Sequence, residues 1–200
     1  MPAVKYLTEN GYHVVGTGET DHRVFSGIKG YYSFENLKIS YDMINLFSLM
    51  SCFLFIGQNS GPFFLSTSCT IPCLLTDTAP HCEGPVEADD IILYKTLCLN
   101  GKPLSLVEIY RKHEDLAFWR YQGNDGLTLE SNTETEILEA VKETIARING
   151  TLVMSEEDEL LCEKFRELPS KEMPLSYTGN RTSLHILRQI KEELLAVPPK

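Results

Sequence analysis

The sequence predicts an α/β fold in which a doubly wound parallel sheet is followed by a helical tail. Short apolar runs alternate with helical patterns along residues 1–150. One of these runs, Phe53–Ile56, is apolar throughout, which is typical of a strand covered on both faces in a parallel sheet. Beyond Gly150 only helical patterns follow. We therefore expect an α/β domain over residues 1–150 and a helical extension over residues 151–200.

The elements can be placed in order from the apolar periodicity. The first ten residues predict an amphipathic helix with Val4 and Leu7 inward, ended by Gly11. A helix that leads directly into a strand suggests a chain that starts partway through a βα pattern, with an upstream domain missing or separate. Strands are expected at His13–Val15, Tyr31–Phe34, Phe53–Ile56, Pro72–Thr76, Ile91–Tyr94 and Leu127–Leu129.

Helices are expected between these strands at Tyr41–Met50, Ser60–Cys69 and Leu104–Arg111. The first of them is expected to be buried through Ile44, Phe47 and Leu49. A longer helix follows the last strand. Thr133 and Glu136 form its capping box, and its apolar stripe is Ile137, Val141, Ile145 and Ile148.

The same helix has an i,i+4 pair, Glu143 and Arg147, which is expected on the solvent side. In the tail, Ser155 begins a second helix, and residues 169–182 form a link to a final one. The expected inward residues of the tail are Leu161, Phe165, Leu168, Leu184, Leu187, Ile190 and Leu194.

The composition is that of a globular protein with an acidic surface. With 42% hydrophobic and 23% charged residues, the chain can form a packed core. The net charge of -10 argues against nucleic acid and against anionic membranes as partners. The sequence has no apolar run long enough to span a bilayer and no basic, apolar leader. We therefore expect a cytoplasmic protein.

The six cysteines predict neither a metal site nor a disulfide framework. None of them forms a C-x-x-C pair, and most lie in apolar or strand-like surroundings. Reduced thiols in the core are the usual state of such residues in a cytoplasmic protein.

The segment from Phe53 to Asp77 has the character of a phosphate-binding corner. A buried strand ends at Ile56, the chain turns at Gly57, and Gln58–Gly61 supply amides, a hydroxyl and exposed backbone N–H groups. The start of a helix concentrates unpaired N–H donors and a positive dipole end, which favour a phosphate. Pro62 fits the first helical turn. The same residues also suit a plain capped helix, and both interpretations remain open.

Several segments, taken in order, resemble one family. The "NSGP" turn of residues 59–62 with "IPCLLTDTAP" of residues 71–80 resembles an element of GT-B sugar-nucleotide transferases such as the heptosyltransferases. The resemblance extends over roughly residues 4–148, to the glycosyltransferases found in bacterial surface-polysaccharide loci. The further segments that carry it are Asp21, Arg23, residues 42–62, "ADDIILYK" (88–95), "LSLVEIY" (104–110) and "SNTETEILEAV" (131–141).

This resemblance implies a Rossmann-like half of a GT-B fold that binds a nucleoside-diphosphate sugar as a substrate, with no bound metal or cofactor. Ser60 and Gly61 would hold the diphosphate, with Gln58, Asn59 and Pro62 beside them. The remaining donor-binding residues that it implies are Gly16, Thr17, Gly18, Arg23, Asp77, Lys95, Asn132 and Thr133. Asn132 and Thr133 would reach the nucleoside. Lys95 and Arg23 would be cations for phosphate, although solvated side chains fit both positions equally well.

Two departures from the family pattern bear on activity. The family pattern has Arg-x-Gly where this chain has Gly16-Thr17-Gly18. The chain also has the length of one GT-B half, so an acceptor half would come from an N-terminal domain or a partner chain. Two alternatives to a glycosyltransferase therefore stay open: a non-catalytic nucleotide-sugar-binding or scaffold domain, and half of a nucleotide-sugar epimerase.

Overall fold

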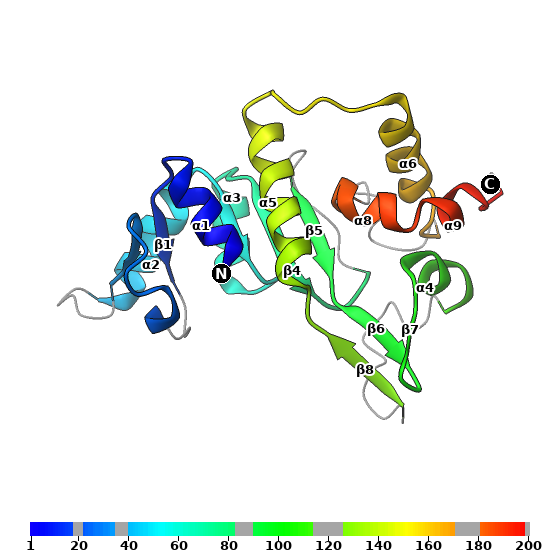
Figure 1. Cartoon of the computed structure of the whole chain (residues 1–200). Helices are drawn as coiled ribbons and strands as arrows, with labels where there is room; N and C mark the ends of the chain where they lie inside the picture. Colours follow the sequence, from blue (N-terminus) through cyan, green and yellow to red (C-terminus); the bar gives the residue numbers. More distant parts are fainter. Residues whose placement is uncertain (18–21, 35–39, 83–89, 114–125, 171–180, 199–200) are drawn as a thin grey trace.

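The computed structural model describes residues 1–17, 22–34, 40–82, 90–113, 126–170 and 181–198, and it has an α/β architecture (Figure 1). The helices are α1 (Pro2–Glu9), the 3-10 helix η1 (His22–Phe25), α2 (Tyr41–Ser51), α3 (Gly61–Ser68), α4 (Leu106–Lys112), α5 (Glu134–Ile148), α6 (Glu156–Arg166), α8 (Leu184–Gln189) and α9 (Lys191–Leu195). The strands are β1 (Val14–Gly16), β2 (Tyr31–Ser33), β3 (Phe55–Gly57), β4 (Cys73–Thr78), β5 (Ile91–Tyr94), β6 (Thr96–Leu99), β7 (Lys102–Pro103) and β8 (Leu127–Glu130).

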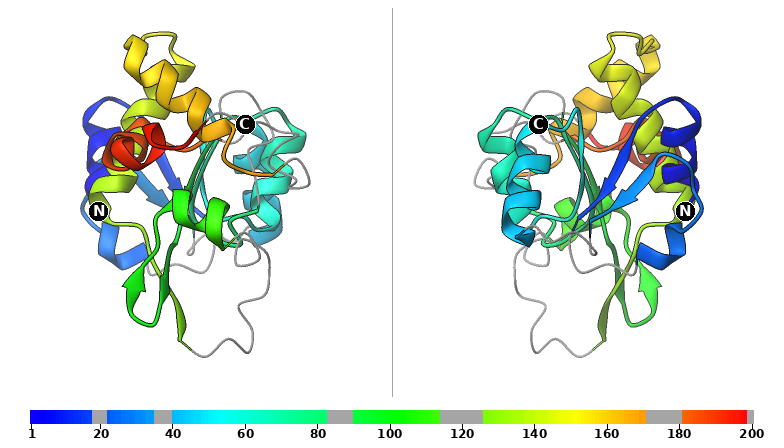
Figure 2. Two further views of the ribbon diagram at one scale, coloured as in Figure 1. Left: turned by 90° about the vertical axis from the view of Figure 1, so that its right-hand side faces the viewer. Right: turned by 90° about the vertical axis from the view of Figure 1, so that its left-hand side faces the viewer.

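Two parallel sheets form the centre of the molecule. Strands β1 and β2 pair in parallel with Val14 opposite Tyr31, and β3-β4-β5 form a second parallel sheet with β4 in the middle. Figure 2 shows α2 and α3 on one side of these strands and α1 and α5 on the other. The parallel α/β arrangement expected from the sequence is thus confirmed.

The third sheet is antiparallel and was not expected. Its order is β7-β6-β8, with Leu97 of β6 opposite Leu129 of β8. Leu127–Leu129 is a strand as predicted, but it belongs to this antiparallel sheet, so the expectation of a single parallel sheet was wrong for this strand. The missed signal is the Asn100-Gly101 turn, whose φ angles of 52° and 75° are those of a two-residue hairpin turn.

The predicted capping signals are confirmed at the start of α5 and of α6. The Thr133 side chain accepts a hydrogen bond from the Glu136 N–H, and Ser155 does the same for Asp158. Such a cap contributes about 1 kcal/mol of helix stability. The buried residues of α5 include Val141 and Ile145 of the predicted stripe.

Two predictions of burial were wrong, and both concern the same region. Phe47 of α2 was expected in the core but is 75% exposed. The run Phe53–Ile56 was expected to be covered on both faces, but Phe53 is 46% and Ile56 36% exposed. Only Phe55 of that run is buried, because β3 lies at the edge of its sheet, where one neighbouring strand is lacking among the described residues.

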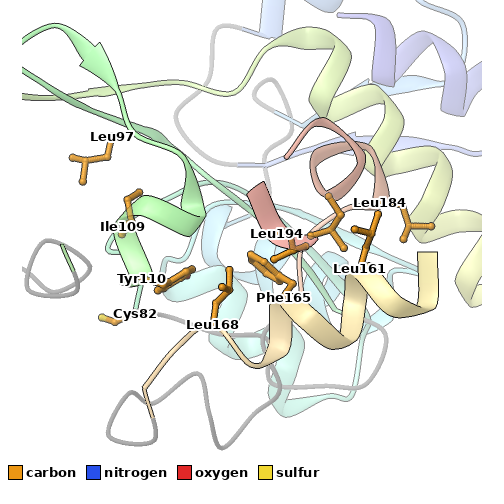
Figure 3. Packing of buried hydrophobic residues seen from close by; sticks show 10 residues of the cluster. Cys82, Leu97, Ile109, Tyr110, Leu161, Phe165, Leu168, Leu184 and Leu194 are labelled. Atoms are coloured by element: carbon orange, nitrogen blue, oxygen red, sulfur yellow. The ribbon is translucent and has the colours of Figure 1, made fainter. Parts of the chain in front are cut away.

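The tail packs on the α/β part through a shared apolar cluster (Figure 3). Phe165 of α6 is 1% exposed, and its ring centroid lies 6.3 Å from that of Tyr110 in α4. Burial of a side chain of this size contributes about 2–3 kcal/mol. The cluster crosses the expected boundary at residue 150, since it contains Cys82, Leu97, Ile109, Tyr110, Leu161, Phe165, Leu168, Leu184, Leu187 and Leu194.

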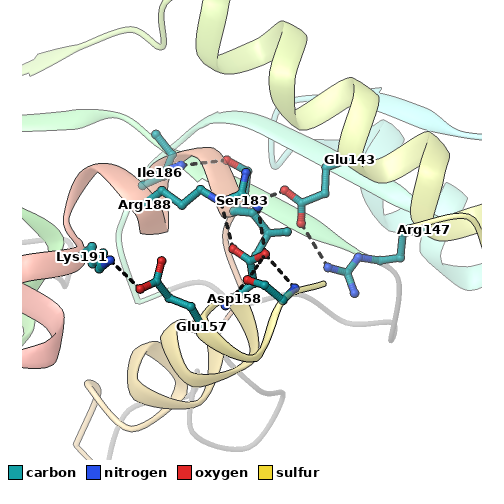
Figure 4. A network of polar contacts seen from close by, with 10 residues as sticks. Glu143, Arg147, Glu157, Asp158, Ser183, Ile186, Arg188 and Lys191 are labelled. Carbon is teal, nitrogen blue, oxygen red and sulfur yellow. Dashed lines mark hydrogen bonds and ion pairs between the residues drawn. The ribbon is translucent and has the colours of Figure 1, made fainter. Parts of the chain in front are cut away.

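A polar network also ties the tail to α5 (Figure 4). Glu143 accepts a hydrogen bond from the Leu184 N–H at 2.6 Å and one from Arg147 at 3.1 Å. The pair of Glu143 with Arg147 was expected on the solvent side, but Glu143 is buried because α8 covers it. Burial raises the pKa of Glu143, and its bonds to Leu184 and Arg147 oppose that rise.

Candidate functional site

The candidate site is the turn from β3 into α3, at the carboxyl edge of the three-stranded parallel sheet. Gly57 ends the strand, and a Cβ there would lie 2.6 Å from Cζ of the Phe55 ring, so a larger residue would force that ring to shift. The chain then passes through Gln58 and Ser60 to the start of α3 at Gly61. Because successive parallel strands end at this edge, ligands of open α/β sheets bind here.

The amino end of α3 is exposed and has no side-chain cap. Ser60 is the N-cap residue, yet its hydroxyl accepts no cap hydrogen bond from the helix. It lies 3.4 Å from the Gln58 carbonyl instead. A Cβ added at Gly61 would meet no atom within 4 Å, so the space beside this residue is open. The helix start thus offers its backbone donors and its positive dipole end to an incoming ligand.

The turn is held against the exit of β4. Asn59 donates from Nδ2 to the Ala79 carbonyl at 3.1 Å. Since Ala79 follows the last residue of β4, this bond fixes the loop at the sheet edge. Asn59 therefore positions the turn in this structure, while the exposed Gln58, Ser60, Gly61 and Pro62 face outward.

Asp77 and Asn132 form a second fixed point at the same edge. Asp77 has a φ of 51°, and its N–H donates to Asn132 Oδ1 at 2.6 Å. The Asn132 N–H donates back to Asp77 Oδ1 at 2.7 Å, and Asn132 Nδ2 donates to the Tyr94 carbonyl at 2.9 Å. Asn132 thus joins the ends of β4 and β5 to the start of α5. Its side chain, like that of Thr133 in the capping box, is used in bonds within the protein.

Lys95 follows β5 and lines a small polar pocket of about 140 Å³ at this edge. His81 lies in the pocket wall, stacked on Tyr94 with ring centroids 5.2 Å apart. His81 Nε2 donates to the Lys95 carbonyl at 2.8 Å, because a carbonyl can only accept. Burial lowers the pKa of His81 to about 4, and the bond to Lys95 only partly opposes this. The imidazole is therefore neutral at pH 7.

Residues from three further segments complete this pocket. Ser105 begins α4, Glu136 lies in the first turn of α5, and Thr182 precedes α8. The Thr182 hydroxyl is buried and makes no hydrogen bond to any described residue. A pocket of this volume is smaller than typical ligand sites of about 300–1,000 Å³. No sequence signal pointed to Ser105 or Thr182, since each looks like an ordinary helix cap.

The predicted residues near β1 lie on the other parallel sheet. Gly16 is the last residue of β1 and lies next to His22 and Tyr31, whose side chains are hydrogen-bonded at 2.6 Å. A Cβ added at Gly16 would lie 2.6 Å from His22 Nδ1. Glycine is therefore needed here for packing. Thr17 lines a separate apolar cavity between β1 and β3, and Arg23 is exposed on η1. Gly18 lies outside the described residues.

The described residues thus place Asn59, Ser60, Asp77, Lys95 and Asn132 along one sheet edge. No group of three or more metal-ligating side chains is gathered in the part of the chain that the structure describes. Nor does that part contain a helix with the length and apolarity to cross a lipid bilayer. Comparison of the chain with protein-family models, with curated proteins and with solved structures found no match.

Proposed function

We propose that the chain is the Rossmann-like donor half of a GT-B glycosyltransferase and binds a nucleoside-diphosphate sugar at the carboxyl edge of β3-β4-β5. The observation that carries this proposal is the amino end of α3. It is exposed, it lacks a side-chain cap, and it directly follows a parallel strand. Backbone donors at such a helix start bind phosphate, and the open space beside Gly61 allows close approach.

The residues around this helix start have complementary roles in the proposal. Asn59 fixes the turn, and Ser60 and the Gly61 N–H contact the diphosphate. Lys95 supplies positive charge from the end of β5, where its side chain is half-buried. Asn132 and Thr133 do not contact the nucleoside in this proposal. They stabilise the sheet edge through their hydrogen bonds with Asp77 and Glu136.

Sugar transfer would also need an acceptor and a general base to take the acceptor's proton, and a non-catalytic binding domain is therefore the second candidate. The observation that favours it is His81. This imidazole at the edge is fully buried and donates to a backbone carbonyl, so it is poorly placed to take a proton from an acceptor. In a GT-B enzyme the acceptor-binding groups come from the other half.

The proposal is tested by isothermal titration of the folded chain against UDP, GDP, ADP and CMP sugars. We expect at least one donor to bind, and Gly61→Val to weaken that binding by tenfold or more. Because a Cβ at Gly61 meets no protein atom, this variant leaves the free protein folded, which its melting temperature checks. If no donor in the panel binds to the folded wild-type chain, the proposal is wrong.

A second pair of variants tests whether the Lys95 ammonium group contacts the phosphate of the donor. Lys95→Met is expected to lower donor affinity by roughly tenfold, since one charged contact to phosphate contributes about 1–2 kcal/mol. Lys102→Met in the exposed strand β7 is the matched control and should bind as the wild type does. Release of free nucleoside diphosphate from the bound donor would distinguish an enzyme from a non-catalytic binding domain.

A further inference from the structure

An apolar cavity of about 760 Å³ separates the two parallel sheets. We call it the interstrand cavity. Strands β1 and β3 form its side walls, and each is the end strand of its own sheet. Both strands contribute consecutive residues to the wall: Val14 and Val15 from β1, and Phe55 and Ile56 from β3. Side chains of successive strand residues point to opposite faces, so the cavity extends through the sheet layer from one face to the other.

The two wall strands run in the same direction. Tyr12 lies two residues before β1 and Phe53 two residues before β3, and their rings are stacked with centroids 5.7 Å apart. The amino ends of the two strands are therefore neighbours. Thr17, which follows β1, and Ile56 of β3 also line the cavity.

One backbone N–H group of each wall strand, that of Val15 and that of Ile56, points toward the cavity, as the hydrogen bonds of the preceding residues indicate. The Val14 N–H donates to the Gly30 carbonyl at 2.9 Å, toward β2, and the Phe55 N–H donates to the Pro72 carbonyl at 3.0 Å, toward β4. Backbone N–H groups alternate in direction along an extended strand. The N–H groups of Val15 and Ile56 consequently point away from β2 and β4, into the interstrand cavity.

Helices lie on both sides of the strands that wall this cavity (Figure 2). Leu7 of α1 and Ile145 of α5 line one face, while Ile44 and Leu49 of α2 line the other. A space with strand edges at its sides and helices above and below has the surroundings of one strand in a doubly wound sheet. The exposed apolar side chains noted above, Phe47, Phe53 and Ile56, all line this space.

We propose that the interstrand cavity receives one apolar β-strand, parallel to β1 and β3 and carried on the amino side of α1. A strand there would give the spatial order β2, β1, new strand, β3, β4, β5. With the new strand first in the chain, this is the order 3-2-1-4-5-6 of the doubly wound fold. This inference is independent of what binds at the carboxyl edge.

The position of α1 supports a connection from its amino end. The Met1 amino group lies 3.4 Å from Glu134 Oε1, at the start of α5. The start of α5 is the carboxyl edge of the sheet, where Asn132 bonds to Asp77 and Tyr94. A strand parallel to β3 ends at this same edge, so a short βα loop could join it to α1. The crossover would then return through α1 to β1 in the usual way.

The test is a fusion to the full chain. A strand of five valine and isoleucine residues and a three-residue Gly-Asn-Gly loop are placed before Met1, and the control fusion has proline at the central strand position. We expect the first fusion to slow hydrogen exchange at the Val15 and Ile56 amides by tenfold or more relative to the control. Proline cannot donate to a ladder, so the control should exchange like the unfused chain.

Two side-chain variants of the fused protein check where the strand binds. Ile56→Asp is expected to abolish the protection at Val15, because it places a carboxylate in the cavity wall. Val24→Asp is the control, since Val24 is 53% exposed on η1 and does not line the cavity. Equal exchange in the valine–isoleucine and proline fusions would overturn the proposal. It would also be overturned if the unfused chain forms a dimer whose Val15 and Ile56 amides are protected, because a second copy would then fill the space.

Discussion

The ion pair between Asp158 of α6 and Arg188 of α8 is expected to be a main contributor to the packing of these two helices within the tail (Figure 4). Arg188 donates from Nε to Asp158 Oδ1 and from its terminal nitrogen to Oδ2, both at 2.9 Å. Asp158 is 3% exposed, and its Oδ2 also accepts from the N–H and hydroxyl of Ser155. Arg188→Met keeps the aliphatic stem and removes both charge-assisted bonds. Each such bond contributes about 1.5 kcal/mol, so we expect a loss of about 2–3 kcal/mol.

The neighbouring pair of Lys191 with Glu157 provides the matched control. It joins α9 to α6, with Lys191 Nζ 2.5 Å from Glu157 Oε1, but the Glu157 side chain is 52% exposed, whereas that of Asp158 is 5% exposed. Lys191→Met should lower the free energy of unfolding by about 0.5 kcal/mol, as is usual for an exposed ion pair. Urea unfolding at pH 7 measures both variants. For a chain of this length the expected losses correspond to melting temperatures lower by about 4–12 °C for Arg188→Met and about 1–2 °C for Lys191→Met.

The same pair predicts a pH dependence. The hydrogen bonds from Arg188 lower the pKa of Asp158 to about 2 from its ordinary 3.8. The stabilisation by Arg188 is therefore fully present above pH 3.8 and is lost as the pH falls through about 2. The difference between wild type and Arg188→Met should shrink over this window. Equal losses for the two variants at pH 7, or a difference that persists at pH 2, would refute the reasoning.

Three other predictions concern stability. Asn132→Ala removes the side-chain hydrogen bonds to the Asp77 N–H and to the Tyr94 carbonyl. We expect it to lower the free energy of unfolding, measured with urea, by about 2 kcal/mol, and a decrease below about 0.5 kcal/mol would contradict the positioning role. His81 has its pKa lowered by burial from 6.5 to about 4, so stability should fall as the pH drops from about 6.5 to 4, by up to about 3 kcal/mol. His81→Gln keeps a hydrogen-bond donor but does not titrate, so it should remove this part of the pH dependence of stability. If the stability of the variant varies with pH as that of the wild type does, His81 is not its cause. Phe165→Ala should lower the free energy of unfolding by about 3–5 kcal/mol, whereas Leu160→Ala, on the exposed face of α6, should lower it by less than about 1 kcal/mol. Similar decreases for both variants would show that the shared apolar cluster is not the main contact between the tail and the α/β part.

Much of the local structure could be predicted from the sequence. The capping box at Thr133, the helix cap at Ser155 and the apolar run Ile91–Tyr94 predicted elements close to those observed. These features depend on residues within a few positions of one another, through helix caps and side-chain periodicity. The turn from Gly57 to Gly61 was likewise recognised as a helix start at the end of a strand.

The tertiary structure decided which of these elements share a surface. Asn132 bonds to Asp77, 55 positions earlier in the chain, and so is used to hold the sheet edge together. Phe47 and Ile56 carry the pattern of core residues but are exposed beside the interstrand cavity. A sequence pattern specifies that a side chain is apolar, whereas its burial depends on whether another element covers it. That choice rests on long-range packing, which no local pattern contains.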